Sequence, residues 1–339
     1  MIIGIDHGTT KITFAFLTND LKLKTYSRFK PLKPFQSIVM ENGFVLDDID
    51  AVVFPYSMGD AISEIVGIKD AENRGVKGKS GVKIGSGTRL FDELKELSLP
   101  VFLLPGIHRN IECLDERFKV AYSHIASGEK LASCYYVFRQ FGEKSFLLSD
   151  ISSNTVSVAV VDGEVKGGID ATLGAMGLIQ GPIDLEGIRR IENGEDPHAV
   201  FSSCGIVKFW GKGVAYEEIG EKLVESMRHD KRAKLAFDTL IMTVKMEIFS
   251  LLSVFDVNTL YITGSFGVMD EVYGKIKEEL QIDVKRITEH SGAIGSAYIG
   301  KDMLDGNSMV IDLAFTTVSI GANDKASAGQ SFTVEIPGT

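Results

Sequence analysis

The sequence predicts an α/β protein made of two similar domains, and two observations lead to that expectation. A strand–turn–strand unit at residues 1–26 returns 144 residues later at residues 146–169. Outside these units, short β-branched runs alternate with long segments whose apolar residues recur at helical spacing, as in sheets flanked by helices. The length of 339 residues agrees with two domains of ordinary size.

The first unit opens the chain. Residues 1–5 form a short β-branched run, and residues 6–11 have the composition of a turn. Residues 12–16 alternate large and small side chains, which is the period of a strand with one buried face. Asn19-Asp20 then precedes a further extended segment at 21–26.

The second unit matches the first without a gap. Asp6 falls on Asp150, and the strand that follows matches through the pairs Ile12 with Val156, Phe14 with Val158, Ala15 with Ala159 and Phe16 with Val160. Asp162-Gly163 gives a tight hairpin signal before residues 164–169. The repeat predicts two similar domains that face each other.

The remaining elements fit this scheme. Strands are expected at 51–54, 101–104, 259–263 and 283–287, and helices at 127–141, 215–228, 231–255, 268–280 and 291–304. Residues 67–88 are rich in Gly and Lys and are expected to form a flexible flap, while strand-like pieces occur at 309–318 and 331–336. We therefore expect an N-terminal domain at 1–145, a C-terminal domain at 146–305 and a tail at 306–339.

Composition excludes several classes of protein. With 36 basic and 46 acidic residues, the net charge of −10 disfavours non-specific nucleic-acid binding. No apolar run approaches the ~20 residues of a membrane span, and the start lacks the basic and apolar regions of a signal peptide. Cys113, Cys134 and Cys204 show no C-x-x-C spacing and are interpreted as reduced core thiols of a cytoplasmic protein, against a disulfide scaffold or zinc ribbon.

The turn between the first two strands carries chemistry. Asp6-His7-Gly8-Thr9-Thr10-Lys11 places a carboxylate at a strand end before small and hydroxyl residues. Glycine lets the backbone approach a phosphate, threonine hydroxyls donate to its oxygens, and the carboxylate holds Mg²⁺ through water. An ordinary hairpin turn is the alternative, but the repeat at Asp150 favours two opposed turns around one polyphosphate.

These residues resemble a known superfamily. Gly4-Ile5-Asp6-His7-Gly8-Thr9-Thr10 is similar to the first phosphate loop of the ASKHA superfamily, which contains acetate and sugar kinases, heat-shock chaperone ATPases and actin. The segment from Asp150 through Ser152, Ser153, Asn154 and Thr155 resembles the second phosphate loop. Leu260–Gly267, with Gly264, Ser265 and Gly267, resembles the adenosine motif, and His290–Ala297 resembles the second connecting helix. The four motifs occur in the family's order.

The resemblance implies two ribonuclease H-like (actin-like ATPase) domains with mixed sheets and an interdomain nucleotide cleft for ATP and Mg²⁺. The acetate/butyrate kinase branch is the nearest, through Tyr122–Ser127 with its His124 and through the segment Gly167–Gly174. The whole chain also resembles the methanogenesis marker protein 12 family, which implies an archaeal methanogen source and no established reaction.

The sequence departs from the superfamily at the second loop. Ser152, Ser153 and Asn154 replace three glycines, and Ser265 replaces a glycine of the adenosine turn. Side chains hinder close backbone approach and disfavour positive φ, although their hydroxyl and amide groups can contact phosphate themselves. We expect these replacements to affect catalysis more than they affect nucleotide binding.

Each candidate residue has a structural alternative. Asp6 either organises Mg²⁺ or caps a turn. Asp150 either organises Mg²⁺ or acts as a general base. His124 either stabilises charge on a transferring phosphoryl group or caps a helix. Lys11 either neutralises phosphate or is a solvated strand residue, and His7 is expected to face solvent.

One further motif is rejected. Gly78-Lys79-Ser80 suggests the P-loop pattern G-x-x-x-x-G-K-[ST], but position 73 is Asn73 and Gly81 opposes an immediate helix. Residues 74–89, with Gly85 to Arg89, are instead expected to form a surface loop.

The sequence thus favours an ATP·Mg²⁺-dependent phosphoryl transfer to a small acceptor such as a carboxylate. The alternative is a conformational switch or activator in which ATP binding closes the domains and a protein partner reads the closed state. A scaffold that has lost ATP is the third hypothesis. A homodimer is left open.

Overall fold

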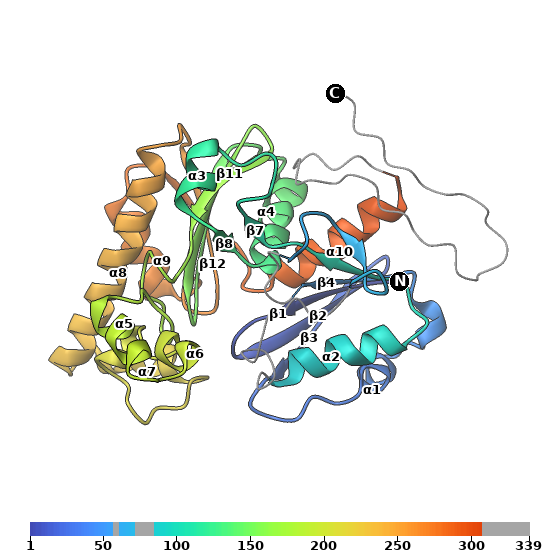
Figure 1. The fold of residues 1–339 in the computed structure, drawn as a ribbon, viewed down its shortest axis with the longest axis horizontal. Helices are drawn as coiled ribbons and strands as arrows, with labels where there is room; N and C mark the ends of the chain where they lie inside the picture. The colour runs from blue at the N-terminus through green and yellow to red at the C-terminus, as the bar shows by residue number, and fades with distance from the viewer. Residues whose placement is uncertain (57–60, 72–84, 307–339) are drawn as a thin grey trace. The chain divides into compact units, whose positions relative to one another are not determined.

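The computed structural model describes residues 1–56, 61–71 and 85–306 (Figure 1). The chain divides into two compact units. Unit 1 contains Met1–Gly142, Gly163–Val165 and the segment that begins at His290, and unit 2 contains Glu143–Asp162 and Lys166–Glu289. Each is described by itself below.

Unit 1 is built on a mixed sheet in the order β3-β2-β1-β4-β6-β5. β1 (Ile2–His7), β2 (Lys11–Leu17) and β3 (Leu21–Ser27) form an antiparallel meander. β4 (Ala51–Pro55) and β6 (Val101–Leu104) run parallel to β1, and the short β5 (Val66–Gly67) closes the edge antiparallel to β6. Five of these strands lie where the sequence predicts them or extend the predicted segments by one to two residues, and β5 is the exception.

Helices cover both faces of this sheet. α1 (Phe35–Glu41) and α2 (Gly85–Glu96) contribute Ile38, Val39 and Phe91 to the core that Ile3, Ile5 and Phe14 form on one face, because alternate strand residues point the same way. α4 (Gly128–Phe141) and α10 (Ser291–Leu304) pack together, and α10 also covers the opposite face of β1 and β4. The remaining elements are η1 (Leu46–Asp48), β7 (Ile107–His108), α3 (Glu116–Ala121) and β8 (His124–Ala126).

Unit 2 repeats the meander. Its sheet has the order β11-β10-β9-β12-β13, in which β9 (Phe146–Ile151), β10 (Thr155–Val161) and β11 (Glu164–Ile169) take the places of the first three strands. β12 (Thr259–Thr263) and β13 (Asp283–Arg286) extend it in parallel. Asp162 and Gly163 have φ of 53° and 87°. Two successive positive φ values are typical of the tightest hairpin turns, so the predicted Asp-Gly hairpin is confirmed.

The helices of unit 2 are α5 (Leu185–Glu192), α6 (Pro197–Phe201), η4 (Ile206–Lys208), α7 (Ile219–Ser226), α8 (Lys231–Leu252) and α9 (Asp270–Glu279). The long α8 begins at Asp230, whose carboxylate accepts the N–H of Arg232, and it buries Leu240, Val244 and Ile248 against the sheet. The two mixed α/β sheets flanked by helices confirm the predicted fold class.

The gapless repeat is wrong by one residue in its second strand. In unit 1 Asp6 pairs with Thr13, whereas in unit 2 Asp150 pairs with Val156. Counted between the last paired residues, the connection from β1 to β2 (residues 8–11) is therefore one residue longer than that from β9 to β10 (residues 152–154). Because side chains alternate along a strand, this difference exchanges the faces of the second strand relative to the gapless match.

Three other expectations need revision or lie outside the described chain. α10 packs on β1, β4 and α4 of unit 1, so the structure groups residues from His290 with the N-terminal domain instead of with 146–289. Residues 85–89 begin α2 and are not a surface loop. Gly78-Lys79-Ser80 and the strand-like pieces at 309–318 and 331–336 lie outside the described residues.

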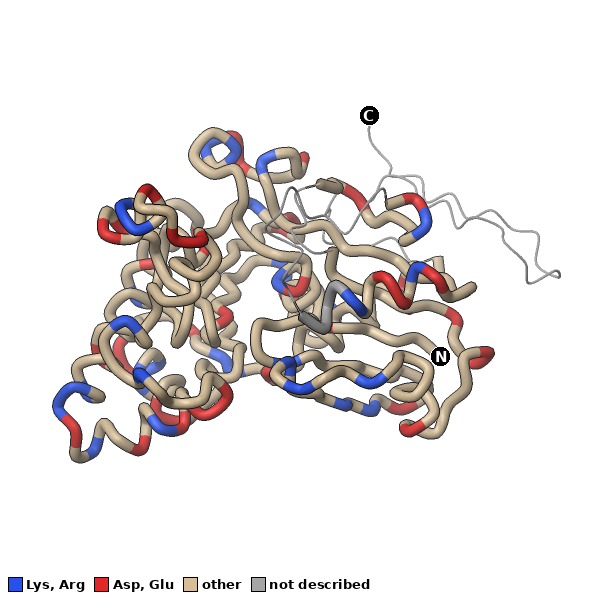
Figure 2. The backbone as a smooth tube through the Cα atoms, turned by 60° about the horizontal axis from the view of Figure 1, so that its bottom comes forward, with Lys and Arg blue, Asp and Glu red and all other residues tan. Residues whose placement is uncertain are grey.

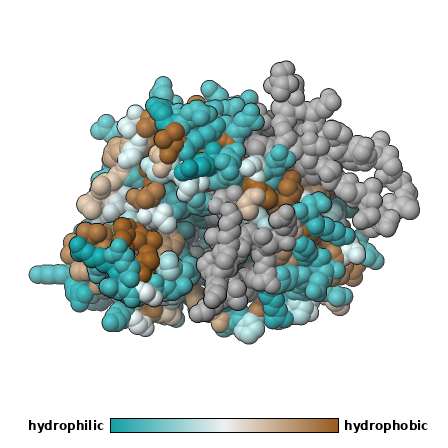
Figure 3. Space-filling model, viewed as in Figure 1, coloured by the Kyte–Doolittle hydropathy of each residue, from teal (hydrophilic) through white to brown (hydrophobic). Residues whose placement is uncertain are grey.

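The surface mixes charges of both signs along the described backbone of each unit (Figure 2). Among the described helices, none is both long enough and apolar enough to cross a bilayer. The face seen in Figure 3 is largely hydrophilic, with apolar side chains gathered at the lower left over α5 to α7, where Leu185 and Ile188 are exposed.

Candidate functional site

Loop 1, residues 8–10, connects β1 to β2 and presents backbone N–H groups. Within the described part of the chain, the N–H groups of Gly8, Thr9 and Thr10 donate no hydrogen bond. The loop carbonyls are engaged instead, since Arg28 donates through Nη1 to the carbonyl of Gly8 at 2.8 Å and through its own N–H to that of Thr10 at 2.9 Å. Arg28 therefore fixes loop 1 with its amides available to an anion, as in phosphate-binding turns.

Asp6 lies beside the first turn of α10. A Cβ on Gly292 would lie 2.8 Å from Oδ2 of Asp6, so the carboxylate reaches the helix at a position where only glycine leaves it room. The N-terminus of a helix carries partial positive charge, which attracts acidic side chains. Two residues earlier, a Cβ on Gly4 would lie 2.1 Å from the carbonyl oxygen of Ala293, so β1 and α10 touch through their backbones.

A partly buried cluster of charged side chains lies next to loop 1. Burial lowers the pKa of Arg28, and the nearby carboxylate of Glu129 acts in the opposite direction. Ser127 Oγ donates to Glu129 Oε1 at 2.5 Å, and the buried Lys130 has its Nζ 3.7 Å from the same oxygen. No sequence pattern marks Arg28, Glu129 or Lys130, because the end of β3 and the start of α4 meet only in the folded chain.

His7 does not face solvent as expected. It pairs with Ile12 on the core side of the sheet, and its ring packs edge-on against Phe54 with centroids 6.0 Å apart. Burial, with a smaller contribution from Arg28, lowers the pKa of His7 to about 3, so the ring is neutral at physiological pH. Its Nε2 is buried and has no hydrogen-bond partner among the described residues.

The other two candidates of unit 1 are half-buried. Lys11 is the first residue of β2, and His124 is the first residue of β8, where it pairs with His108. No hydrogen bond or ion pair between described side chains joins His124 to loop 1. Its catalytic role stays a prediction.

Loop 2, residues 152–154, is the counterpart of loop 1 in unit 2. Ser152 Oγ donates to Asp150 Oδ1 at 3.0 Å, and the N–H of Ser152 donates to the carbonyl of Asn154 at 2.8 Å. The N–H groups of Ser153 and Asn154 donate no hydrogen bond to the described residues. Loop 2 thus keeps two available amides without the three glycines of the superfamily.

A segment that we call the strap, residues 176–180, holds loop 2 from one side. The N–H of Leu178 donates to the carbonyl of Ser152, and the N–H groups of Ile179 and Gln180 donate to the carbonyl of Ser153. A Cβ on Gly177 would lie 2.4 Å from the Cα of Asn154, so glycine is required for this approach. The carbonyls of Ser152 and Ser153 therefore face the strap, whereas that of Asn154 accepts a hydrogen bond within the loop.

The strap also changes the expectation for Thr155. Its hydroxyl donates to the carbonyl of Met176 at 2.9 Å, and the side chain is fully buried. Ser153 is also buried, at 8% exposure. Among the residues predicted to contact phosphate, the side chains of Ser152 and Asn154 are half-buried. That of Thr155 is buried and bonded to the strap.

The predicted adenosine turn lies directly beside Asp150. Phe266 and Gly267 donate their N–H groups to the carbonyl of Ile151. Gly264 has φ of +88°, and a Cβ there would lie 2.4 Å from Oδ1 of Asp150. Glycine is required at 264 for both reasons. Hydrogen bonds to Ile151, the residue before loop 2, thus connect the turn that contains Gly264, Ser265 and Gly267 to loop 2.

Glu247 is a buried acid that the sequence analysis did not single out. It lies on α8, is 3% exposed, and accepts the N–H of Ala175 through Oε2 at 2.6 Å. Thr243, one turn earlier, accepts the N–H of Met176. Burial, reinforced by Asp170, raises the pKa of Glu247 to about 7, while hydrogen bonds lower it. Through residues 175–176, α8 anchors the strap behind loop 2.

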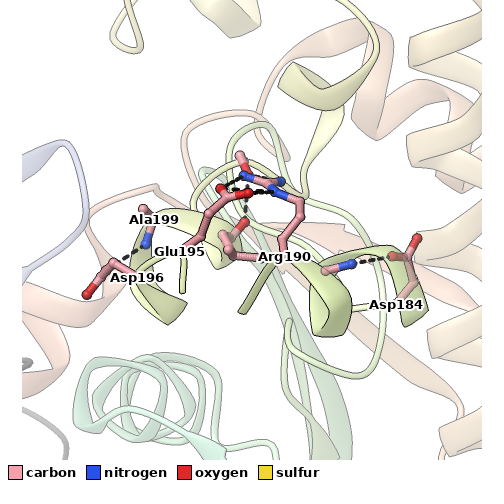
Figure 4. A network of polar contacts seen from close by, with 8 residues as sticks. Asp184, Arg190, Glu195, Asp196 and Ala199 are labelled. Carbon is pink, nitrogen blue, oxygen red and sulfur yellow. Dashed lines mark hydrogen bonds and ion pairs between the residues drawn. The ribbon is translucent and has the colours of Figure 1, made fainter. Parts of the chain in front are cut away.

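Residues 205–207, at the start of η4, lie along the strap. The carbonyls of Gly177, Leu178 and Ile179 accept N–H groups of residues 205–207. Figure 4 shows a polar network around α5 and α6. Arg190 donates to both carboxylate oxygens of Glu195, and Asp184 and Asp196 cap the N-termini of α5 and α6. These contacts are structural.

One aspartate lies near the end of the strand that precedes each loop, Asp6 in β1 and Asp150 in β9. Mg²⁺ takes one or two carboxylates and completes its shell with water and phosphate oxygens, in contrast to ions held in all-protein cages. The described residues contain no cluster of three acidic, His or Cys side chains that would hold a metal alone.

Comparison with known proteins places the chain in a family. The family described as "protein of unknown function (DUF1464)" matches residues 4–315. The chain belongs to the DUF1464 family. A UPF0285 protein of Methanocaldococcus jannaschii is 41% identical over 320 residues, covering 92% of this chain and 98% of that protein. A UPF0285 protein of Methanothermobacter thermautotrophicus is 37% identical over 326 residues, with coverages of 92% and 98%.

Solved structures share the fold of this DUF1464 protein. The acetate kinase of Porphyromonas gingivalis aligns with a TM-score of 0.62 at 11% identity, covering 88% of this chain and 99% of that one. A propionate kinase of Francisella tularensis gives 0.60 at 15% identity, with coverages of 87% and 97%. A ROK family glucokinase of Streptomyces griseus, in complex with glucose and AMPPNP, gives 0.52 at 16%, with coverages of 89% and 99%. The predicted ASKHA fold is confirmed.

Proposed function

We propose that this protein binds ATP with Mg²⁺ and transfers the terminal phosphoryl group to a small acceptor such as a carboxylate. The observation that supports this most is the pair of loops, each with amides that donate no hydrogen bond within the described chain and each following a strand that ends near an aspartate. Repeated amide-rich turns of this kind bind phosphate oxygens. The fold shared with acetate and propionate kinases gives further support.

In this proposal, loop 1 and loop 2 donate N–H groups to the phosphates, and the turn with Gly264, Ser265 and Gly267 lies against the adenosine. Asp6 and Asp150 hold Mg²⁺ through water, and the bound ion would neutralise charge on the phosphates. Lys11 adds positive charge, and His124 stabilises the transferring group. Arg28 keeps loop 1 in its donating geometry by binding the carbonyls of Gly8 and Thr10.

Isothermal titration calorimetry with ATP and Mg²⁺ tests the binding step. We expect one ATP per chain, and we expect Asp6→Asn and Asp150→Asn each to weaken it about tenfold or more, since each removes one anionic ligand of the cation. Glu192→Gln, which changes an exposed carboxyl on α5, serves as the control. Absence of ATP binding by the wild-type chain refutes the proposal.

A conformational switch is the second candidate, and loop 2 favours it. The carbonyls of Ser152 and Ser153 accept hydrogen bonds from the strap, and Ser152, Ser153 and Asn154 stand where the superfamily has glycines. This loop is therefore less adaptable than a glycine-rich one. An ATP-binding chain with slow turnover would then signal to a partner protein.

Product analysis separates the two candidates. A kinase with a carboxylate acceptor forms an acyl phosphate, which hydroxylamine traps as a hydroxamate when acetate, propionate or a larger acid is supplied. A switch instead releases phosphate without an acceptor, at a rate that a partner protein raises. Hydroxamate formation that Asp150→Asn abolishes supports the kinase.

A further inference from the structure

The long helix α8 has an apolar row on its outer side in addition to its buried face. Leu235, Met242, Met246 and Phe249 are 50% to 61% exposed, although Leu240, Val244 and Ile248 already fill the interior side. The four exposed residues are spaced by seven, four and three positions, so they lie along one side of the helix. Thr239 continues the row between Leu235 and Met242.

Such a row is unusual for a surface helix, whose outer side is normally polar. Contiguous exposed apolar side chains mark surfaces that bind another molecule. The spacing of seven is the repeat by which two helices pack along a common seam. The row therefore fits a second helix, and the charges beside it indicate which one.

The charged residues on one side of the apolar row would be complementary to the same residues of a second copy. Asp238 and Lys245 lie seven residues apart on the same side of the seam and carry opposite charges. If two copies of α8 paired in parallel, this flank of one helix would face the opposite flank of the other, and Asp238 would not meet Lys245. If they pair antiparallel, Asp238 of each copy meets Lys245 of the other, which forms two equivalent ion pairs around a two-fold axis.

We propose that α8 is a self-association surface, through which two copies of this chain pair antiparallel with Asp238 opposite Lys245 of the second copy. In this register Met242 packs against Thr239 of the second copy, and Leu235 against its Met246. Within one copy Asp238 already contacts Lys234, and Lys245 contacts Glu279, so the new pairs join existing ones into a network. The proposal is independent of ATP binding.

Sedimentation velocity of the full chain tests the association. A single helix pair is a small interface, so we expect a dissociation constant of about micromolar and a mass that rises from 37.0 kDa toward twice that value with concentration. Met242→Glu is expected to leave only monomer. Val120→Glu, at an 83% exposed site on α3, is the matched control and should dimerise like the wild type.

A charge exchange tests the antiparallel register. Asp238→Lys alone and Lys245→Asp alone should each weaken dimerisation about tenfold, and the double variant should recover it. Circular dichroism checks that each variant keeps its fold. A wild-type chain that is monomeric at all concentrations, or a dimer that survives Met242→Glu, overturns the proposal. A double variant without recovery overturns the antiparallel pairing.

Discussion

Glu247 shows how a single carboxyl group links a helix to a loop. Its Oε2 accepts the N–H of Ala175, and a Cβ on Gly174 would lie 2.1 Å from that oxygen, so the segment and the acid are closely fitted. The carboxyl is enclosed by α8 and β10, with Asp170 as the charged group that faces it. Its raised pKa of about 7 follows from loss of water around the ionised form.

The stability of the protein should therefore depend on the protonation of Glu247. Between the unfolded pKa of 4.5 and the folded value of about 7, the folded chain holds a proton that the unfolded chain releases. Stability then falls as pH rises through this window, by about 3 kcal/mol for a full shift of this size. Glu247→Gln should remove that part of the pH dependence and be more stable than the wild type at pH 8.

Urea denaturation at several pH values between 5 and 8 measures this effect. The comparison of interest is the difference between Glu247→Gln and the wild type, with Glu192→Gln as the control for a solvated acid. Parallel curves for Glu247→Gln and the wild type would contradict the prediction.

At the scale of single residues, the sequence could nominate as candidates those residues that belong to a recognisable motif. Asp6, Asp150 and Gly264 lie at strand ends and turns where local chemistry is diagnostic. Arg28 and Glu129 come together only through tertiary packing, which no local pattern contains. Glu247 did carry a signal, since it is an acid among the buried positions of the apolar stripe of α8.

At the scale of elements, the packing of α10 depends on residues without side chains. A Cβ on Gly295 would lie 1.8 Å from the carbonyl oxygen of Ala132 on α4, and one on Gly300 would lie 2.8 Å from Val53 of β4. The helix thus lies against the backbone of α4 on one side and against a side chain of β4 on another. Because Gly292 touches Asp6, this packing also fixes the surroundings of loop 1.

Gly295→Ala should destabilise the protein by about 3 kcal/mol, because α4 or α10 must shift to admit the methyl group. Gly274→Ala on α9 provides the matched change, since a Cβ there meets nothing within 4 Å. Removing a glycine from an exposed helix should stabilise by about 0.5–1 kcal/mol. Thermal unfolding of the two variants should therefore shift in opposite directions, and similar losses in both would argue against tight α4–α10 packing.

The sequence predicted most elements to within a few residues, because their apolar periodicity and turn residues agree. It did not predict that α10 groups with unit 1, since residues 291–304 follow β13 of unit 2 in the chain and only packing reveals their partners. It also placed the second strand of the repeat one residue out of register, because a gapless match has no means to detect a longer turn.

At the scale of the whole molecule, the proposed nucleotide binding should stabilise the folded chain by mass action. At an ATP concentration of about 100 times the dissociation constant, with Mg²⁺ present, the expected gain is about 2.7 kcal/mol. Differential scanning calorimetry measures it as a rise in the unfolding temperature, which a chelator of Mg²⁺ should largely reverse. An unchanged unfolding temperature at saturating ATP would contradict the proposal.

The fold class was predictable at this scale because four motifs occur in a fixed order over residues 4–300. The acceptor of the proposed phosphoryl transfer was not predictable, since this architecture hosts several unrelated activities and no local pattern in the sequence identifies an acceptor.

The contact of Gly4 with Ala293 has a consequence for how variation in this protein is interpreted. Gly4 and Asp6 lie on the same face of β1, two positions apart, yet Gly4 is constrained by the lack of space under α10, whereas the role proposed for Asp6 depends on its charge. If that proposal holds, selection for soluble protein alone in a library that randomises β1 should retain Gly4, and only selection for turnover should retain Asp6. A position that does not vary beside a proposed metal-binding carboxylate is therefore no sign that it takes part in a reaction.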